Sequence, residues 1–349
     1  MIADDVLRKA LSVLASGERL PADATGAAVE ALISGEASSV LAASFLTGLR
    51  VQGESADQLV SAARALRKHS SRVSTHQKPL VDTCGTGGDG QSTFSISTAS
   101  ALVAAGAGAA VAKHGNRAAS GKFGGADTLE ALGVAIELSA DGSGRCLDEA
   151  GIAFLFARRL HPAMRHVAPI RSELKIRTIF NLLGPLINPA GVRRQVIGVP
   201  SREALTLVAE ALAELEVEHA LVVHSRDGLD EISLAAENDL IEVREGKLRS
   251  FTLSAVDLKL SEVSPADLRA ETLEDSVRIV RQILAGEPSP QADVVAANTG
   301  AALYVAGLSE TIEDGVKKAQ ASMSSGAAAD ALARLVEISN REFARGHVA

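Results

Sequence analysis

The sequence predicts an α/β protein with a small helical N-terminal domain and a larger α/β domain, in which helices flank a mainly parallel central sheet. Residues 1 to about 70 carry helical patterns and no strand pattern, whereas short apolar runs alternate with helical segments from residue 80 onward. Such alternation is typical of a parallel sheet covered by helices. Polar loops also follow three of the expected strands, at the edge where parallel sheets bind ligands. The 349 residues are enough for two domains.

The N-terminal region is expected to be entirely helical. Val6, Ala10 and Val13 recur at helical spacing, and Ser55 or Asp57 could cap a later helix. Short helices without strands cannot bury all their apolar faces among themselves. We therefore expect this region to pack on the rest of the chain or on a partner subunit.

The expected domains are a helical one at 1–74 and a larger α/β one at 75–171 and 191–349, with a helical segment near 172–190 returning to the first. The expected strands are 80–81, 110–112, 134–136, 152–156, 195–199 and 220–223, followed by a hairpin of 240–243 and 248–253. The expected helices of the larger domain are 98–107, 126–132, 203–215, 271–285, 291–306 and 311–343, the last broken near 324–326. The apolar connection from Asn181 to Pro189 could be a hinge between the domains or a plain packed connection.

Composition and charge narrow the class of protein. Charged residues make up 22% and hydrophobic residues 46% of the chain, which is ordinary for a globular protein. The net charge of −8 disfavours non-specific binding to nucleic acid. Cys84 and Cys146 form no disulfide framework and no metal-ligand spacing, which favours reduced thiols. Because we find no signal-peptide pattern and no apolar run that could span a bilayer, we expect a cytoplasmic protein without a membrane partner.

The most informative segment is the glycine-rich loop Gly85–Gly90, which follows a short apolar strand. Glycines let backbone N–H groups approach an anion closely, and a helix expected to begin near Ser97 adds its N-terminal N–H groups. The loop therefore favours phosphate binding, although a tight strand-to-helix turn is the simpler alternative. Its glycine spacing matches neither a Walker A loop nor a dinucleotide-binding fingerprint.

A second polar loop follows the strand 110–112. It contains the cations Lys113, Arg117 and Lys122 together with His114 and Asn116. Cations beside a phosphate loop suit a substrate that carries several phosphates, whereas the alternative is a solvated basic loop. Since Lys113 directly follows a buried strand, we expect it to point to the ligand-binding edge, while an isolated histidine such as His114 is more often structural than catalytic.

A third loop contains the adjacent carboxylates Asp230 and Glu231 after an apolar strand. Such a pair can coordinate Mg²⁺ directly or through water, and a diphosphate substrate needs such a metal. The alternative is an exposed acidic turn.

The segment from His161 to Arg171 offers arginines that could bind a carboxylate. Pro169 is expected to break any helix there, and Arg165 or Arg171 held near such a break could clamp a carboxylate through two hydrogen bonds. The alternative is a pair of surface arginines.

Taken together, these motifs resemble the anthranilate phosphoribosyltransferase family of tryptophan biosynthesis, over essentially the whole chain. The segments that carry the resemblance are Gly85–Gly90, Ser97–Thr98, Lys113–Arg117, Arg171, Phe180–Asn181, Gly184–Leu186, Asn188–Pro189 and Asp230–Glu231. The resemblance implies a homodimer formed through the helical domain, with a fold of the nucleoside-phosphorylase type. It implies transfer of the phosphoribosyl group of phosphoribosyl pyrophosphate (PRPP) to the amine of anthranilate.

The resemblance also implies roles for individual residues. Those that would bind PRPP are Gly85, Gly88, Asp89, Thr93, Ser95, Ile96, Ser97, Thr98, Lys113, His114, Gly115, Asn116, Arg117, Ala118, Ala119, Ser120, Gly121 and Gly125. Those that would contact anthranilate are Gly85, Asn116 and Arg171, with His114 and Arg165 as neighbours of the aromatic ring. Those that would bind Mg²⁺ are Ser97, Asp230 and Glu231. No residue is assigned as a general base.

Three positions depart from the family pattern. Ser95 replaces the usual Asn, and Phe123 and Gly125 replace two serines near the PRPP phosphates, so Gly85–Gly90 should carry a larger share of phosphate binding. Two other functions remain open: a pyrimidine nucleoside phosphorylase, which Arg171 and the acidic pair disfavour, and a nucleic-acid-binding relative, which the net charge of −8 disfavours.

Overall fold

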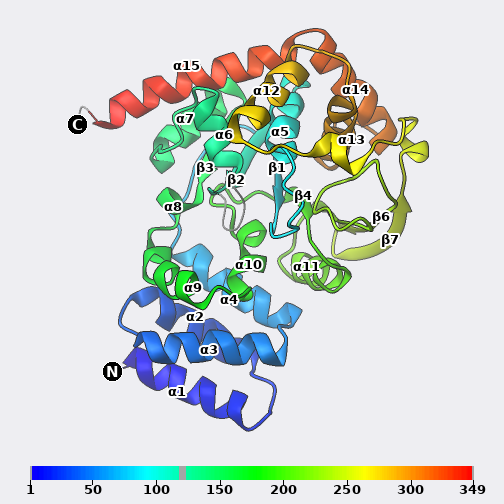
Figure 1. Ribbon diagram of the computed structural model, residues 1–349. Coiled ribbons are helices and arrows are strands. Elements are labelled where there is room, and N and C mark those ends of the chain that lie inside the picture. The colour runs from blue at the N-terminus through cyan, green and yellow to red at the C-terminus, as the bar shows by residue number, and fades with distance from the viewer. Residues whose placement is uncertain (1, 118–122, 348–349) are drawn as a thin grey trace.

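The computed structural model describes residues 2–117 and 123–347 (Figure 1). The N-terminal region is helical, as the sequence predicted. Its helices are α1 (Ile2–Ala15), α2 (Ala22–Ser34), α3 (Ser39–Gln52) and α4 (Ala56–Lys68). Ser55 is the N-cap of α4, and its backbone N–H donates to Gln58 Oε1 at 3.0 Å.

The larger part of the chain is built on a seven-stranded sheet of order β3-β2-β1-β4-β5-β6-β7. The strands are β1 (Leu80–Gly85), β2 (Ala110–Gly115), β3 (Ile152–Phe156), β4 (Arg194–Gly198), β5 (His219–Ser225), β6 (Asn238–Arg244) and β7 (Lys247–Leu253). The first five strands pair in parallel, and the hairpin of β6 and β7 adds an antiparallel edge. The predicted fold class is therefore confirmed.

Helices cover both faces of this sheet (Figure 1). The α-helices of the larger domain are α5 (Ile96–Gly106), α6 (Gly125–Ala131), α7 (Ala140–Ala150), α8 (Ala157–Leu160), α11 (Arg202–Glu214), α12 (Leu273–Leu284), α13 (Pro290–Ala306), α14 (Ile312–Ser324) and α15 (Ala327–His347). Two further helices, α9 (Ala168–Leu174) and α10 (Ile179–Leu183), lie beside the N-terminal helices, and short 3₁₀ turns are η1 (Pro162–His166), η2 (Gly184–Ile187), η3 (Val256–Leu258) and η4 (Pro265–Leu268). No helix in the described ranges is both long enough and apolar enough to cross a membrane.

The sheet separates two apolar cores, because successive residues of a strand face opposite sides. In β5, Leu221 and Val223 lie in the core that α5 and α13 complete. Ala220 and Val222 lie in the core that α11 shares with the N-terminal helices. The helical domain thus packs on the rest of the chain through the face of the sheet that α11 covers.

The structure corrects the expected strand at 134–136. These residues form an irregular connection between α6 and α7, in which Val134 and Ile136 are buried without pairing to the sheet. A short apolar run signals burial, and periodicity alone does not decide whether a strand follows from it.

Helix α7 was not predicted from the sequence, because its two glycines weaken a helical pattern. Cys146 and Leu147 nevertheless bury one face of this helix. The reason for Gly144 is close packing, because a Cβ there would lie 2.2 Å from the carbonyl oxygen of Ser74.

The connection from Asn181 to Pro189 is packed in this structure, as one of the two alternatives predicted. It folds as α10 and η2. Three side chains donate hydrogen bonds to carbonyl oxygens of η2: Arg67 Nε to Leu186 (2.8 Å), Gln195 Nε2 to Pro185 (2.8 Å) and His114 Nδ1 to Gly184 (3.1 Å). These donors come from α4, β4 and β2, so the connection fixes the helical domain to the sheet.

Candidate active site at the carboxyl edge of the sheet

The strand order places the candidate site at the carboxyl ends of β1 and β4. The chain runs from β1 to β2 on one side and enters β4 on the other, which makes this point a topological switch of the kind where parallel sheets bind ligands. The loops after β1 and β5 meet here, since Gly87 N donates to Asp230 Oδ2 at 2.9 Å. The end of β2 reaches the same point, because Lys113 Nζ donates to Ser97 Oγ at 3.1 Å.

Two glycines allow the Asp230 loop to lie directly over the strand ends. Gly85 and Gly198 are register partners in β1 and β4. A Cβ on Gly85 would lie 2.6 Å from Asp230 Oδ2, and a Cβ on Gly198 would lie 1.5 Å from the backbone oxygen of Asp230. Gly198 was not predicted as a site residue, although a glycine that ends a strand beside the glycine-loop strand was a usable signal.

Replacing Gly198 by Ala should displace the Asp230 loop. We expect a loss of stability of about 2–4 kcal/mol, the range typical of large steric conflicts in packed regions, and a marked fall in activity. Thermal or urea unfolding with kinetics measures both effects. Gly184→Ala is a matched control, because a Cβ there would meet nothing within 4 Å. Equal behaviour of the two variants would contradict the role of Gly198.

The acidic pair is half-buried. Burial, together with the nearby carboxyl of Asp89, raises the pKa of Asp230 to about 7. Burial and the charge of Asp230 raise the pKa of Glu231 to about 8. Ionised forms of both groups therefore need a cation beside them.

The donor set at this point fits Mg²⁺. Glu231 accepts a hydrogen bond from the Ser97 backbone, so the predicted ligands Ser97, Asp230 and Glu231 lie together. Their oxygen atoms are the ligand type that Mg²⁺ prefers. Among the described residues, no group of three or more His, Cys, Asp or Glu side chains could hold a metal ion. A magnesium ion here would therefore take hydroxyl, water and phosphate oxygens as well as the two carboxylates.

Lys113 lies beneath the site rather than projecting from its edge. Its ammonium group is buried and donates to the carbonyl oxygen of Thr83 at 2.6 Å as well as to Ser97. Burial lowers the pKa of Lys113, and the buried carboxylate of Asp82 opposes that shift. Asp82 in turn accepts hydrogen bonds from His114 N (3.1 Å) and Asn188 Nδ2 (2.8 Å). This buried network holds the ends of β1 and β2 in place.

His114 is buried, and both of its ring nitrogens are hydrogen-bonded within the protein. Its Nδ1 donates to the carbonyl oxygen of Gly184, so its Nε2 accepts the hydrogen bond of 3.1 Å from His161 Nε2. Burial lowers the pKa of His114 to about 3 and that of His161 to about 4, so both rings are neutral at pH 7.

Arg117 is exposed, and its guanidinium is paired with carboxylates. Its Nη1 donates to Asp127 at 2.6 Å and to Glu130 at 2.8 Å, both on α6. Neighbouring Asn116 is exposed and free to face a ligand. The PRPP residues expected at Ala118, Ala119, Ser120 and Gly121, and Lys122 with them, lie outside the described residues.

The three departures from the family pattern have structural consequences. Ser95 Oγ shares a hydrogen bond of 2.7 Å with Thr128 Oγ1 on α6. Phe123 packs against the apolar core of the sheet. A Cβ on Gly125 would lie 2.8 Å from Thr98 Oγ1, which is buried and has no hydrogen-bond partner within the described residues.

The arginine segment differs from the expectation in one respect. Pro169 does not break a helix but lies in the first turn of α9, where proline is tolerated. Arg171 is half-buried on this helix and lies over the Phe180 ring at 5.6 Å. No described residue offers it a carboxylate, and burial lowers its pKa. Arg165 is exposed and donates to His166 Nε2 at 3.2 Å, so Arg171 is the stronger candidate for binding a carboxylate.

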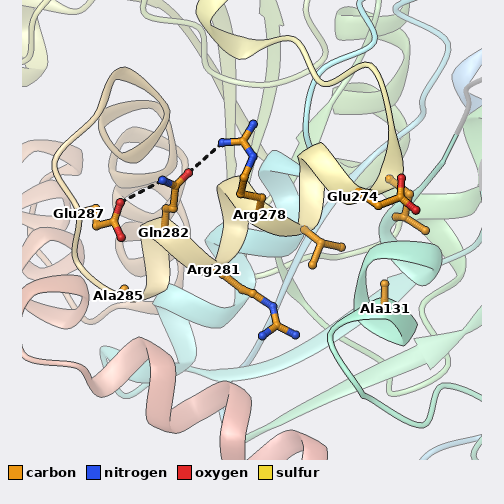
Figure 2. A pocket seen from close by; sticks show the side chains of 9 residues that line it. Ala131, Glu274, Arg278, Arg281, Gln282, Ala285 and Glu287 are labelled. Atoms are coloured by element: carbon orange, nitrogen blue, oxygen red, sulfur yellow. Dashed lines mark hydrogen bonds between the residues drawn. The ribbon is translucent and has the colours of Figure 1, made fainter.

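A surface pocket of about 600 Å³ lies elsewhere and contains none of the predicted site residues. It is lined mainly by one face of α12, where Arg278 donates to Gln282 at 3.2 Å and Gln282 to Glu287 at 3.1 Å (Figure 2). The residues predicted to bind phosphate and metal lie instead at the carboxyl edge of the sheet.

The fold and the site define an α/β protein suited to bind phosphate and a metal at the carboxyl edge of its sheet, and comparison with known proteins agrees with this class. Residues 8–70 match the helical bundle domain and residues 77–329 the a/b domain of the glycosyl transferase family. The chain belongs to this family, among the anthranilate phosphoribosyltransferases.

Curated relatives and solved structures cover nearly the whole chain. The anthranilate phosphoribosyltransferase of Rubrobacter xylanophilus is 50% identical over 98% of this chain and 100% of its own. The anthranilate phosphoribosyltransferase of Thermomicrobium roseum is 48% identical over 95% of this chain and 96% of its own. The crystal structure of the Thermus thermophilus enzyme matches with a TM-score of 0.90 at 43% identity, covering 95% of this chain and 99% of that one. The Saccharomyces cerevisiae enzyme in complex with PRPP and Mg matches with a TM-score of 0.90 at 27% identity, covering 97% of this chain and 99% of that one.

Proposed function

We propose that this protein transfers the phosphoribosyl group of PRPP to the amine of anthranilate, giving N-(5-phosphoribosyl)anthranilate and pyrophosphate, the second step of tryptophan biosynthesis from chorismate. The observation that carries the proposal is the 2.9 Å contact of the glycine loop with Asp230, which joins a phosphate cradle to a carboxylate pair suited to Mg²⁺. A relative that is 50% identical over nearly the whole chain is named anthranilate phosphoribosyltransferase.

The chain's own residues suit a displacement at the ribose C1 atom. The bond from C1 to the pyrophosphate oxygen breaks, the bond from C1 to the anthranilate nitrogen forms, and the amine releases one proton to water or to the departing pyrophosphate. Ser97, Asp230 and Glu231 would hold Mg²⁺, which neutralises charge on the departing pyrophosphate when it is bound. The loop N–H groups and the first turn of α5 stabilise the same charge. Because the anthranilate amine is already a neutral nucleophile, positioning contributes more than a strong base.

The substrates would be held by different parts of the edge. PRPP would lie along the glycine loop, Asp89, Thr93, the 95–98 turn and the 113–125 loop. Anthranilate would lie near Gly85 and Asn116, with its carboxylate on Arg171, whose guanidinium has no carboxylate partner among the described residues.

We further propose the domain division 1–74 plus 172–190 against the remainder, and a homodimer formed through the helical domain. Ile2, Val40 and Val51 support the dimer, since they expose 80%, 72% and 82% of their surface on α1 and α3. A cytoplasmic location accords with the two cysteines, which are both free and buried.

Anthranilate fluorescence tests the reaction directly. It should fall when the protein is mixed with PRPP and Mg²⁺, and omission of any one component should abolish the change. No change across a range of pH and metal concentration would reject the proposal. Phosphorolysis of thymidine or uridine would instead indicate a nucleoside phosphorylase, and tight salt-sensitive binding of single-stranded DNA a nucleic-acid-binding protein.

A further inference from the structure

Arg177 connects the glycine loop to the helical domain. It lies in the short segment between α9 and α10, and its Nη1 donates a hydrogen bond of 2.8 Å to the carbonyl oxygen of Gly87. α9 packs against α3 and α10 against α4, so this segment belongs in space to the helical domain. Neither the motifs nor the resemblance assigned a role to this residue.

The contact depends on a glycine at the next position of the loop. A Cβ on Gly88 would lie 1.9 Å from Arg177 Nη1, and Gly88 has a φ of +84°. The guanidinium therefore lies against bare backbone, which only glycine permits in this conformation.

The Gly87 residue is held from both sides. Asp230 Oδ2 accepts from its N–H at 2.9 Å, while Arg177 donates to its carbonyl oxygen. In a trans peptide, the carbonyl and the following N–H point in opposite directions. Fixing the Gly87 carbonyl on Arg177 therefore directs the Gly88 N–H away from Arg177.

A second observation concerns Glu54, which follows α3. Its side chain is 3% exposed and its Oε2 pairs with Arg50 at 3.2 Å, but its Oε1 is buried without a hydrogen-bond partner among the described residues. The charges of Glu54 and Asp230 both act to raise the pKa of Arg177, against the lowering by burial. The guanidinium of Arg177 thus interacts electrostatically with an acidic group of the helical domain and with one of the active-site edge.

We propose that Arg177 is a positioning residue of the PRPP site, which fixes the Gly87–Gly88 peptide so that the loop N–H groups are arranged to receive a phosphate. This role rests on the proposed function. Arg177 acts through the loop and is not assigned a contact with the reacting atoms.

Hydrogen exchange in the ligand-free protein tests the positioning directly. Arg177→Ala should increase deuterium uptake in peptides covering residues 85–92, and Arg177→Lys should increase it less, because an ammonium retains one donor. Arg158→Ala is the matched control, since Arg158 is exposed on α8 and has no side-chain partner within the described residues. Uptake in Arg177→Ala equal to that of the wild type would overturn the proposal.

Steady-state kinetics give the second readout. Arg177→Ala should raise KM for PRPP roughly 10- to 100-fold, as expected for one hydrogen bond from a charged donor, with kcat and KM for anthranilate little changed. Arg177→Lys should recover much of this loss. A fall in kcat with unchanged KM for PRPP would overturn the proposal. A wild-type protein without transferase activity would remove the proposed function, while the exchange measurement would still decide whether Arg177 orders the loop.

Discussion

The double variant Asp230→Asn, Glu231→Gln should lose nearly all Mg²⁺-dependent transferase activity. A metal that neutralises a leaving group contributes several kcal/mol, so loss of about 4 kcal/mol corresponds to a roughly 10³-fold fall in kcat/KM. Both amides keep the size of the carboxylates, so the loop that packs on Gly85 and Gly198 should be retained. Initial rates measured by anthranilate fluorescence over a Mg²⁺ titration check this result.

Two further measurements make the result specific to the acidic pair. Glu237→Gln removes an exposed carboxylate that pairs with Arg226, and it should leave the Mg²⁺ dependence intact. The metal-free double variant should also unfold at a higher temperature than the metal-free wild type above pH 8. The reason is that the folded-state pKa values of about 7 and about 8 lie above the unfolded values, so ionisation of both groups destabilises the folded wild type at high pH.

The stability difference should shrink as the pH falls through 8 and then 7, because the wild-type carboxyls become protonated in the folded state. Full Mg²⁺-dependent activity of the double variant would reject the metal role. A stability difference that does not depend on pH would show that the two carboxyls are not buried as described.

The second large effect is expected for Arg171→Ala, which should weaken anthranilate use with little effect on PRPP. Removing one member of a desolvated charge pair typically loses about 3 kcal/mol, which corresponds to a roughly 100-fold rise in KM for anthranilate. The structure supports this size of effect, because Arg171 is half-buried and no described carboxylate neutralises it. Kinetics with each substrate varied in turn separate the two constants.

Arg171→Lys and Arg165→Ala are the informative companions of this variant. Lysine keeps the positive charge but cannot form the bidentate hydrogen bonds of a guanidinium, so we expect an intermediate KM for anthranilate. Arg165 is exposed and donates only to His166, so its loss should have a much smaller effect. A collapse of PRPP affinity in Arg171→Ala, with anthranilate use unchanged, would show that Arg171 binds the other substrate.

Much of the fold followed from local patterns. The N-terminal helices, the alternation of β1 to β5 with helices, and the hairpin of β6 and β7 were predicted because their periodicity and turns are local signals. The strand expected at 134–136 was wrong because burial of Val134 and Ile136 comes from packing on the core, which looks the same in sequence as burial in a sheet. Helix α7 was missed because two glycines weaken its pattern, and Gly144 is explained only by close packing against Ser74, a contact 70 residues away along the chain.

By itself, the sequence determined which chemistry this protein carries: a glycine loop, an acidic pair and an arginine segment whose order and type favour phosphate, metal and carboxylate binding. Only the tertiary structure decided how these groups act together. It placed Lys113 beneath the site and left Arg171 without a carboxylate partner among the described residues. It also brought Gly198 and Arg177 to the loop. Such roles depend on steric fit and burial between distant segments, and neither quantity is encoded in the spacing of residues along the chain.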